Sequence, residues 1–461
     1  MGGGRKAGEA GHYSERMRTD YLITADVNEP LIIMEDEVNF RDAAPGALPE
    51  RSARIVGGKS ASIHRLLLSL LVLSVAINYL DRGSISIAAP VVSKELFLSP
   101  VRMGLLFSAF FWSYTGLMVV AGWLCDRYNI YWVLGSGYLL WSLATLGTGF
   151  ASTFSVLLAL RLLLGLGESV AYPAYSNIIV TRFPIDRRGL PNSLIDAGAK
   201  LGPAIGIFIG GLLVAHFGWR FLFVILGLVS LAWLVPWFAW APREMRVADI
   251  SREAGPSIAQ ILSKRDAWGT FLGNFCCNYA YYFLLTWLPS YLVEERHLSL
   301  SKMAIFGSVP FLVSAFASII GGWGSDRWIR RGATPTLVRK TFVVSGLLLS
   351  TLMLPSAVVK NMYGCFAFLI AAYFAMGLFS SNHWAITQTL AGPLAAGKWT
   401  GLQNACANCA GVTAPYITGL LVATTGKFFL AFLSASFMVL VGAASYLFLV
   451  GRVQPTDWDQ H

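Results

Sequence analysis

The chain has 461 residues, of which 55% are hydrophobic and only 13% are charged, whereas a soluble domain carries about 25% charged residues. This composition excludes an ordinary soluble protein and indicates a polytopic membrane protein. The formal net charge of +10 does not indicate a nucleic-acid partner, because the basic residues fall in short connections between apolar segments. They report membrane topology instead.

The six cysteines all fall inside apolar segments or at their edges, which implies no disulfide framework. Cys406 and Cys409 form a C-x-x-C, but they lie in a Gly- and Ala-rich segment without His or acidic neighbours. Such a segment favours helix packing over metal or redox chemistry. We therefore expect no metal site and no cofactor.

Residues 1–60 mix Gly, Glu, Arg and Asp with only two short apolar runs. A segment of this kind buries too little apolar surface to fold, so we predict a disordered cytoplasmic arm. It has no charged start followed promptly by an apolar core and a cleavage site. We therefore expect no cleaved signal peptide.

Twelve apolar segments then follow one another, each long enough to cross about 30 Å of hydrocarbon. The predicted fold class is an all-α membrane protein with twelve transmembrane helices in two six-helix halves. The predicted domains are the arm 1–60, the first half 61–241, a cytoplasmic linker 242–266, the second half 267–452 and a cytoplasmic tail 453–461. The expected helices cover 64–90, 103–124, 131–150, 155–181, 190–216, 220–240, 267–293, 303–324, 341–359, 363–385, 401–424 and 428–450.

The connections on one side of the predicted membrane carry most of the Lys and Arg residues. The positive-inside rule assigns that side to the cytoplasm and places both termini there. We expect a multi-pass protein of a cell membrane. Because the arm lacks the features of an organelle transit peptide, a bacterial inner membrane is favoured over a eukaryotic membrane.

In the first predicted helix, Asp81 and Arg82 are adjacent. A carboxylate in a poorly solvated site binds its proton more tightly, and an adjacent arginine weakens that binding. An anion bound at Arg82 would remove this effect on Asp81, so that proton and anion bind favourably together, as a symporter needs. The alternative is that Asp81 and Arg82 neutralise each other and serve helix packing.

The end of the second helix reappears two hundred residues later, at the end of the eighth. Gly122 to Arg127 reads GWLCDR, and Gly322 to Arg327 reads GWGSDR. Such a repeat indicates two homologous halves, which bind substrate between them near the bilayer midplane and rock against each other. In each copy the glycine lets helices approach closely and the aspartate meets a neighbouring helix or an arginine. We predict gate latches at Gly122, Asp126, Arg127, Gly322, Asp326 and Arg327; a plain charged loop is the alternative.

The fourth helix carries Arg161 and Glu168 among leucines. Seven residues make almost two turns, so both side chains lie on one face, roughly 10 Å apart, which is too far for a direct pair. An ionised group at mid-bilayer costs about 2.5 kcal/mol or more, so each needs a partner on another helix or in a water-filled cavity. Snorkelling at a helix end is the alternative, but Glu168 is too short for it.

The fifth helix adds Asp196 and Lys200, which are four residues apart and therefore able to pair directly. This spacing is equally compatible with an intrahelical salt bridge near the cytoplasmic side and with Lys200 as a second contact for an anion.

The second half holds few charges but many polar residues within its predicted helices. These offer hydrogen bonds to the hydroxyl groups of a polyol, although small polar residues also pack membrane helices at about 0.6 kcal/mol per contact. We expect only some of them to be ligands. For His383 we favour a neutral side chain packed on a neighbouring helix over a proton relay. The set comprises Asn274, Asn278, Tyr279, Tyr282, Ser380, Asn382, His383, Asn404 and Asn408.

These residues give the chain a resemblance to the major facilitator superfamily. In finer detail it resembles the anion:cation symporter family, which includes bacterial galactonate, glucarate and hexuronate carriers and animal sialic-acid and vesicular glutamate carriers. The resemblance covers residues 64–451. Its most specific pieces are Tyr79-Leu80-Asp81-Arg82, Arg161 to Pro173, Phe283-Leu284-Leu285-Thr286-Trp287-Leu288-Pro289 and Asn404 to Pro415.

The resemblance implies a role for each matching residue. Asp81 and Glu168 match the proton-carrying carboxylates, Arg82 the arginine that holds the substrate carboxylate, and Arg161 the arginine that senses their protonation. The positions that line the substrate cavity in sugar-acid carriers are Tyr79, Tyr114, Ser381, Trp384 and Asn404. Several bacterial carriers have glutamine beside the place of Ala199 and Lys200, which leaves the substrate open.

The expected function is proton-coupled symport of a small organic anion, such as an aldonate, hexuronate or aldarate, by a monomer in the lipid bilayer. The alternatives are an organic-phosphate or other anion exchanger of the same superfamily and a non-transporting nutrient receptor. Asp81 and Glu168 argue against an exchanger, which needs no proton carboxylate. A membrane enzyme is not expected, because no nucleotide loop and no nucleophile with a base occurs in the sequence.

Overall fold

The computed structural model describes residues 58–182, 189–241 and 256–458. Apart from the start of α1 up to Arg65, the helices discussed below lie in one compact unit, residues 66–461. The predicted arm up to residue 57, residues 242–255 of the predicted linker and the last three residues of the tail lie outside the described part.

The described residues of the first half form six helical rods. They are α1 (Gly58–Glu95), α2 (Pro100–Arg127), α3 (Ile130–Thr148), α4 (Phe154–Glu168) followed by α5 (Ala171–Arg182), α6 (Gly189–Ile205) continued by η2 (Gly206–Gly210) and α7 (Gly211–Phe217), and α8 (Trp219–Trp240). Here η marks a π-helical turn. These rods correspond to the first six predicted spans.

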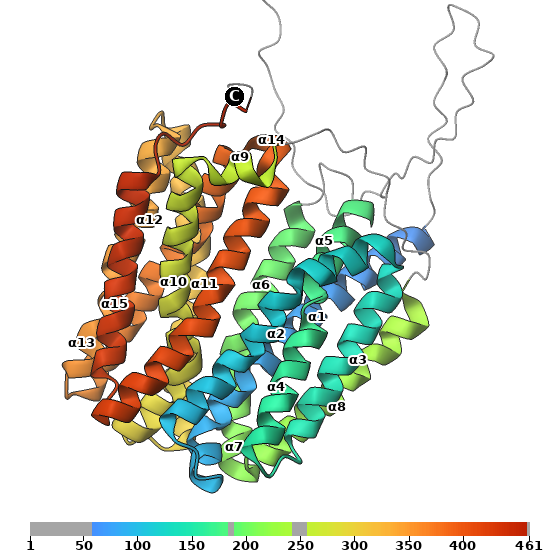
Figure 1. Cartoon of the computed structure of the whole chain (residues 1–461), viewed down its shortest axis with the longest axis vertical. Coiled ribbons are helices and arrows are strands. Elements are labelled where there is room, and N and C mark those ends of the chain that lie inside the picture. The colour runs from blue at the N-terminus through green and yellow to red at the C-terminus, as the bar shows by residue number, and fades with distance from the viewer. Residues whose placement is uncertain (1–57, 183–188, 242–255, 459–461) are drawn as a thin grey trace, which may run out of the picture. The chain divides into compact units, whose positions relative to one another are not determined.

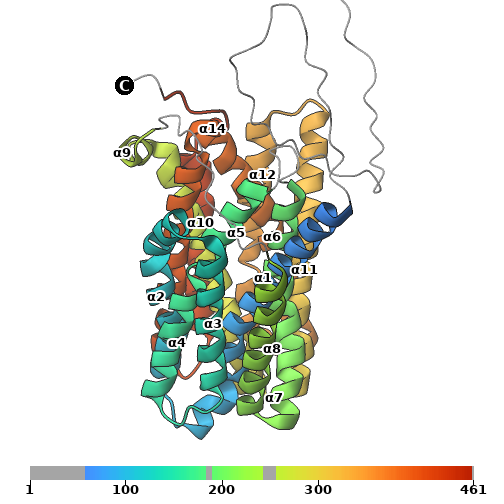
Figure 2. The ribbon, with the colours of Figure 1, turned by 90° about the vertical axis from the view of Figure 1, so that its right-hand side faces the viewer.

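The short α9 (Ile258–Leu262) lies in the predicted linker, and the second half again contains six rods among its described residues. They are α10 (Arg265–Ser290) with η3 (Tyr291–Glu295), α11 (Leu300–Arg330), α12 (Pro335–Ser350) with α13 (Met353–Val358), the two parts of α14 (Met362–Thr425), and α15 (Phe429–Ala444) with η4 (Ser445–Leu449). Figure 1 shows the rods of the two halves as two groups, and Figure 2 shows the same rods with the first half toward the viewer.

The predicted helices 363–385 and 401–424 leave residues 386–400 as a connection. This prediction is wrong, because these residues are helical. α14 runs through this segment and is divided only at Gly392, whose φ of 62° and ψ of −179° lie outside the helical range. Its Leu and Ala residues at 390, 391, 394, 395 and 396 favour helix, and a positive φ is readily adopted by glycine alone. A single residue therefore replaces the expected loop.

Ten of the described rods are long and apolar enough to cross a membrane by length and composition, and α2 and α10 are not among these ten. In α10, asparagine and tyrosine side chains lower the hydropathy, and several of them, including Asn274, Tyr279 and Tyr282, are buried. A helix that turns its polar side chains toward other helices does not expose them to lipid. The low hydropathy of α10 thus indicates polar groups within the protein.

Glycines hold α4 tightly between α2 and α3. A Cβ atom placed on Gly165 would lie 2.3 Å from the carbonyl oxygen of Phe110, and one on Gly167 would lie 2.7 Å from the backbone nitrogen of Trp141. Small residues of this kind let membrane helices approach closely. They fix the position of Glu168, which follows Gly167 at the end of α4.

The two halves contact each other at the end that carries α7 and lies away from α9 (Figure 1). A Cβ atom on Gly211 of α7 would lie 2.6 Å from the Cβ of Ala304 in α11, and one on Gly104 of α2 would lie 2.7 Å from the carbonyl oxygen of Pro415 in α14. Ser108 donates a hydrogen bond to the carbonyl of Val412 at 2.8 Å. These contacts join α2 to the second part of α14 and α7 to α11.

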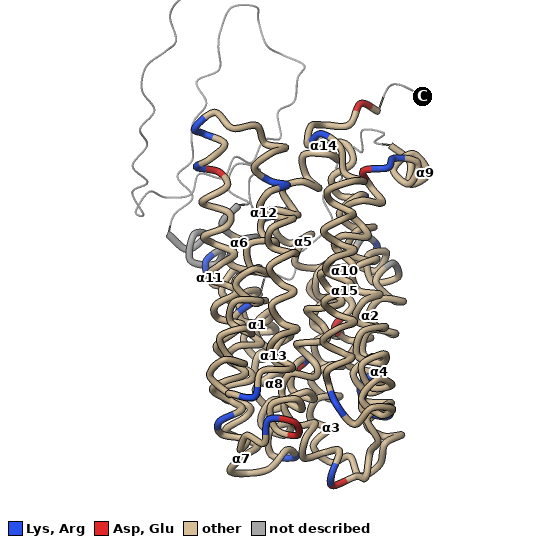
Figure 3. Tube along the Cα trace, turned by 90° about the vertical axis from the view of Figure 1, so that its left-hand side faces the viewer, with Lys and Arg blue, Asp and Glu red and all other residues tan. Residues whose placement is uncertain are grey.

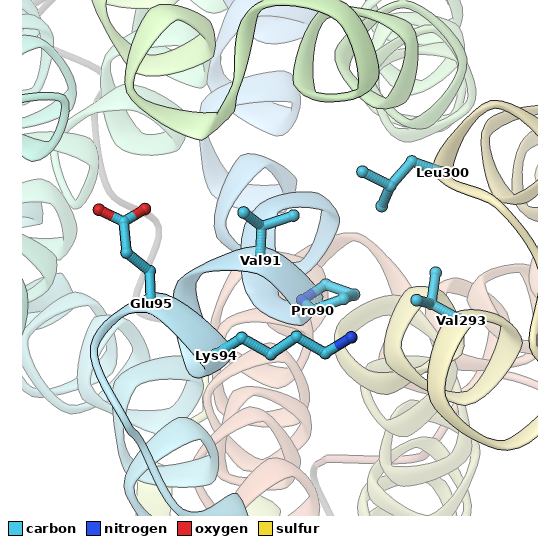
Figure 4. A pocket seen from close by; sticks show the side chains of 6 residues that line it. All are labelled: Pro90, Val91, Lys94, Glu95, Val293 and Leu300. Carbon is cyan, nitrogen blue, oxygen red and sulfur yellow. The ribbon is translucent and has the colours of Figure 1, made fainter.

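A small pocket of about 370 Å³ lies between the halves at this same end. Figure 4 shows Lys94 of α1 reaching across it toward Val293 of η3, while Glu95 points the other way. Glu95 accepts hydrogen bonds from the indole of Trp219, at 2.5 Å, and from Arg220. The end of α1 is therefore anchored to α8 and also faces the second half.

A valine at Gly167 should destabilise the protein, because its side chain would meet the backbone of α3, which cannot move aside without displacing the whole helix. Overpacking of this kind costs about 1–3 kcal/mol or more. Thermal unfolding of the purified protein in detergent should show a lower Tm for Gly167→Val. Gly116→Val is the matched control, because nothing lies within 4 Å of a Cβ at Gly116. Equal Tm values would contradict the packing described for α4.

Candidate functional site

The centre of the first half is an ion pair between Arg82 of α1 and Glu168 of α4. The Glu168 Oε2 atom accepts from Arg82 Nη2 at 3.0 Å and from Arg82 Nε at 3.3 Å. Arg82 is 5% exposed and Glu168 is 0% exposed. A buried charge left alone is strongly destabilising, so each of these residues requires the other or a substitute for it.

Aromatic rings surround the Arg82 guanidinium. Its central carbon lies 4.8 Å from the ring centre of Tyr79, 4.6 Å from that of Phe110 and 4.7 Å from that of Tyr114. The Tyr79 hydroxyl is hydrogen-bonded to the hydroxyl of Tyr172 at 3.1 Å. The faces of aromatic rings attract a cation, so this enclosure stabilises the positive charge without competing for the donors that a carboxylate would use.

Arg161 of α4 contacts the backbone of Arg82 and not the side chain of Glu168. Its Nη2 donates to the backbone carbonyl of Arg82 at 3.3 Å, and its guanidinium lies 5.5 Å from the ring centre of Phe110. Within the described residues no ion pair joins Arg161 to Glu168, as the spacing on α4 predicts. Arg161 thus brings a second buried positive charge next to the residue that binds Glu168.

Asp81 points to a different helix from Arg82. Its Oδ2 accepts from the hydroxyl of Ser230 in α8 at 2.9 Å, while its buried Oδ1 has no hydrogen-bond partner in the described part of the chain. The alternative that Asp81 and Arg82 neutralise each other is therefore wrong for this structure. Adjacent residues on a helix point about 100° apart, which aims Arg82 at α4 and Asp81 at α8.

The second half reaches this cluster through α10. Tyr282 packs on Phe111, the neighbour of Phe110, with 4.6 Å between the ring centres. Its hydroxyl donates to Asn408 Oδ1 of α14 at 3.1 Å. A chain of aromatic rings and an amide therefore connects the surroundings of Arg82 to the second half.

The other predicted cavity residues of the second half lie on α14. Asn404 is half-buried and its carbonyl accepts from the Asn408 amide at 2.9 Å. Trp384 is half-buried and packs on His383, which in turn stacks on Phe379 with 4.6 Å between ring centres. Ser381 accepts from the Asn382 amide at 3.2 Å. These side chains are available for hydrogen bonds, and their role stays a prediction.

Lys200 connects the two halves. Its ammonium donates to the hydroxyl of Ser318 in α11 at 2.8 Å. The predicted pairing with Asp196 involves a side chain outside the described part. A cation that bridges α6 and α11 lies where relative motion of the halves would move it, so Lys200 remains a candidate for binding an anion.

The two predicted gate sequences differ in their surroundings. At the end of α11, Asp326 accepts from Arg339 of α12 at 2.6 Å, and Arg339 also donates to Ser325 and Asn382. Arg327 lies over the ring of Trp323, and Gly322 is in ordinary contact with Ser381.

At the end of α2, a Cβ on Gly122 would meet no described atom within 4 Å, so the expected close helix approach is absent there in the described conformation. Arg127 is exposed, and the side chain of Asp126 lies outside the described part. No described neighbour packs against α2 at this glycine.

Sequence reasoning missed several residues that hold the cluster in place. Asn78 accepts from Arg82 at 3.4 Å, and its position four residues before Arg82 on the same helix was a usable signal. Ser230 was detectable as a lone hydroxyl in an otherwise apolar helix. Phe110, Tyr172 and Arg339 carry no such signal, because ordinary aromatic or basic residues in their positions need no special role.

Two sets of apolar helices around a buried charged cluster are the architecture of a secondary transporter. A family model of the Major Facilitator Superfamily matches residues 71–338. The chain belongs to this superfamily, whose members are transporters and not enzymes, and it is a multi-pass membrane protein.

Relatives that match most of the chain show which members of the superfamily it resembles. The probable galactarate/D-glucarate transporter GarP of Escherichia coli (strain K12) is 30% identical over 434 residues, covering 87% of this chain and 98% of its own. The hexuronate transporter of Bacillus subtilis (strain 168) is 32% identical over 377 residues, covering 79% and 89%. The predicted resemblance to sugar-acid carriers of the superfamily is confirmed.

A solved structure shares the fold. It is a bacterial homologue of the human lysosomal transporter Spinster in an inward-facing and occupied conformation, with a TM-score of 0.73, 18% identity and coverage of 83% of this chain and 96% of its own. The predicted major facilitator fold is thereby confirmed.

Removing the Ser230 hydroxyl should destabilise the protein, because the buried Asp81 carboxylate loses a hydrogen-bond donor. An unsatisfied buried group of this kind costs about 1–3 kcal/mol. Thermal unfolding in detergent should give a lower Tm for Ser230→Ala than for Ser136→Ala, whose exposed hydroxyl bonds only within its own helix. If the two variants unfold at the same temperature, the hydrogen bond between Ser230 and Asp81 does not contribute to stability.

Proposed function

We propose that this transporter carries a small organic anion, a sugar acid such as an aldonate, hexuronate or aldarate, together with protons by alternating access. The observation that carries the proposal is the buried ion pair of Arg82 and Glu168. It combines a group that can bind a carboxylate with a group that can bind a proton, and each is the partner of the other.

In the first step the substrate carboxylate competes with Glu168 for Arg82. A guanidinium presents paired N–H donors that match the two oxygens of a carboxylate. Glu168 uses only one oxygen for Arg82, and its Oε1 has no hydrogen-bond partner within the described residues. A substrate carboxylate that uses both oxygens makes the better-shaped pair and displaces Glu168.

In the second step Glu168 takes up a proton. Without Arg82 its negative charge would be buried and uncompensated, and breaking such a pair costs about 3–5 kcal/mol. Protonation removes this cost, so anion binding favours proton binding. Linkage makes the effect reciprocal, and a protonated Glu168 releases Arg82 for the anion. The pair therefore couples the two ligands without direct contact between them.

Asp81 and Arg161 complete the proposed proton site. Asp81 offers a second buried carboxylate with one oxygen lacking a hydrogen-bond partner among the described residues. Arg161 holds the backbone of Arg82 and adds a positive charge that favours ionised carboxylates nearby. The four side chains carry two positive and two negative charges when all are ionised, so the cluster is neutral before substrate binds.

The sugar part of the substrate requires hydrogen bonds to hydroxyl groups. One hydroxyl pair, Tyr79 with Tyr172, adjoins Arg82, and the hydroxyl–amide pair of Tyr282 with Asn408 reaches the same region from the second half. Lys200 offers a contact for a second carboxylate, which an aldarate possesses. The names of relatives as transporters of galactarate, glucarate and hexuronates support this class of substrate.

We also propose that the described conformation opens toward the cytoplasm. Figure 3 shows most of the charged residues toward the two ends of the rods and a few between them. The end with α9 is the side that the Lys and Arg count assigns to the cytoplasm. The close contacts of Gly104, Ser108 and Gly211 with the second half lie toward the opposite end. The hydrogen bond from Lys200 to Ser318 also joins the halves, and no described atom would lie within 4 Å of a Cβ at Gly122 of the first gate sequence. In this proposal the gate residues approach each other when the transporter faces outward, and the protein is a monomer of a bacterial inner membrane with both termini inside.

Glu168→Gln should abolish proton-driven accumulation while keeping exchange. The amide cannot take up the proton, but Arg82 remains able to bind the anion. Uptake of labelled glucarate into proteoliposomes under an inward proton gradient should fall to the level set by equilibration, and counterflow should continue. Glu294→Gln, which alters an exposed carboxylate, should behave as the unmodified protein. Uphill uptake by the Glu168 variant would contradict the role of Glu168.

Arg82→Lys should weaken substrate binding. Lysine keeps the charge but loses the paired donors, and hydrogen bonds to charged groups are worth about 1.5–3 kcal/mol, so affinity should fall about tenfold or more. The measurement is the concentration of galactarate, glucarate, glucuronate or galactonate needed for half-maximal counterflow. Arg330→Lys, at an exposed helix end, is the control. Equal affinity in the two variants would exclude Arg82 as the anion site, and fast exchange of glycerol phosphate for phosphate would favour an anion exchanger.

A further inference from the structure

A groove with a volume of about 850 Å³ lies on the second half, where α12 runs beside η4 and the segment that follows it. Lys340 and Arg452 line it together with hydroxyl groups such as those of Thr336 and Ser345. Farther along, Val344, Leu348 and Leu447 form an apolar wall. The groove is separate from the Arg82 cluster of the first half.

Three cations surround the end of η4. The Lys340 ammonium donates to the carbonyl of Val450 at 2.5 Å and to that of Leu447 at 3.3 Å. Arg265 donates to the carbonyl of Phe448 at 2.5 Å, and Arg452 follows with an exposed side chain. The carboxylate of Asp266 accepts from the Gly451 N–H at 2.6 Å.

The charge at this place exceeds what the helix end requires. Lys340 and Arg265 already hydrogen-bond the last carbonyl groups of this helix, and Arg452 adds a further positive charge. Among the described residues named here, the three cations and the Asp266 carboxylate leave a net positive charge beside the groove. An ammonium has three N–H donors, and the two contacts of Lys340 named above leave one for an anion.

The hydroxyl of Thr336 adds a further donor. It accepts from the Val453 N–H at 2.9 Å, which leaves its own hydrogen available to a phosphate oxygen. Thr334, at the start of α12, caps this helix by accepting from the Leu337 N–H at 3.3 Å. The positive end of the α12 dipole thus lies at the same end of the groove as the basic side chains.

The apolar end of the groove opens onto the surface that faces lipid. Leu348 is 46% exposed and Leu447 is 52% exposed, as expected for residues in contact with acyl chains. Eight residues of helix separate Lys340 from Leu348, a rise of about 12 Å. The groove therefore joins a basic, hydroxyl-lined mouth to an apolar wall over a length that suits a lipid.

We propose that this groove binds an anionic phospholipid from the leaflet on the Lys- and Arg-rich side. Its phosphate contacts Lys340, Arg452 and Thr336, and one acyl chain lies along Val344, Leu348 and Leu447. Basic sites between transmembrane helices at a membrane surface select anionic headgroups in this way. The proposal is independent of the substrate and of proton coupling.

The test is native mass spectrometry of the full-length protein in detergent, titrated with dioleoyl-phosphatidylglycerol or dioleoyl-phosphatidylcholine. The first phosphatidylglycerol should bind about fivefold more tightly than phosphatidylcholine, and Arg452→Gln should remove most of this preference, since a basic residue near a membrane surface contributes about 1 kcal/mol. Lys427→Gln removes a positive charge from the opposite end of the bundle and should leave the preference unchanged.

A second pair of variants tests the acyl wall. Leu348→Trp fills the groove and should weaken the first phosphatidylglycerol several-fold. Leu349→Trp, at an equally exposed neighbouring position that does not line the groove, should bind like the unmodified protein. Equal binding of the two lipids, or equal behaviour of each variant and its control, would overturn the proposal. Displacement of the bound lipid by millimolar inorganic phosphate would show a site for a free anion instead and would also overturn it.

Discussion

The contact between Arg82 and Glu168 is the constraint on which the rest of the structure depends. The two opposite charges are buried away from water, and neither can remain buried without a partner. The fold meets this requirement by placing α1 beside α4 and by surrounding the arginine with aromatic rings. The same requirement makes the site useful, because anything that takes the place of Glu168 on Arg82 changes the affinity of Glu168 for a proton. Stability and coupling thus rest on one interaction.

The packing of small residues makes that contact possible. Gly165 and Gly167 let α4 approach the backbones of α2 and α3 so closely that any side chain would collide, and Glu168 is held where Arg82 can reach it. Aromatic contacts then extend from Phe110 through Phe111 to Tyr282, which is bonded to Asn408. Movement of the second half relative to the first would therefore shift the aromatic rings that surround the ion pair.

The helices were predictable from hydrophobicity and length, and the need of Arg161 and Glu168 for partners on another helix followed from the cost of burying charge. The identity of those partners was not predictable, because Arg82 and Glu168 are 86 residues apart in the chain and only the packing of α1 on α4 joins them. Adjacency in sequence suggested Asp81 for Arg82, whereas helical rotation separates the two. Likewise, the sequence of residues 386–400 suggested a connecting loop, although a change of backbone direction at Gly392 is sufficient to separate the two parts of α14.

The central claim is that anion and proton bind as linked ligands through Arg82 and Glu168. Titration calorimetry of the purified protein with glucarate, repeated at one pH in buffers of different ionisation enthalpy, measures the number of protons taken up for each anion bound. The account predicts net proton uptake on binding by the unmodified protein and a clear loss of that uptake in Glu168→Gln, which still binds the anion. Anion binding without any proton uptake by the unmodified protein would contradict it.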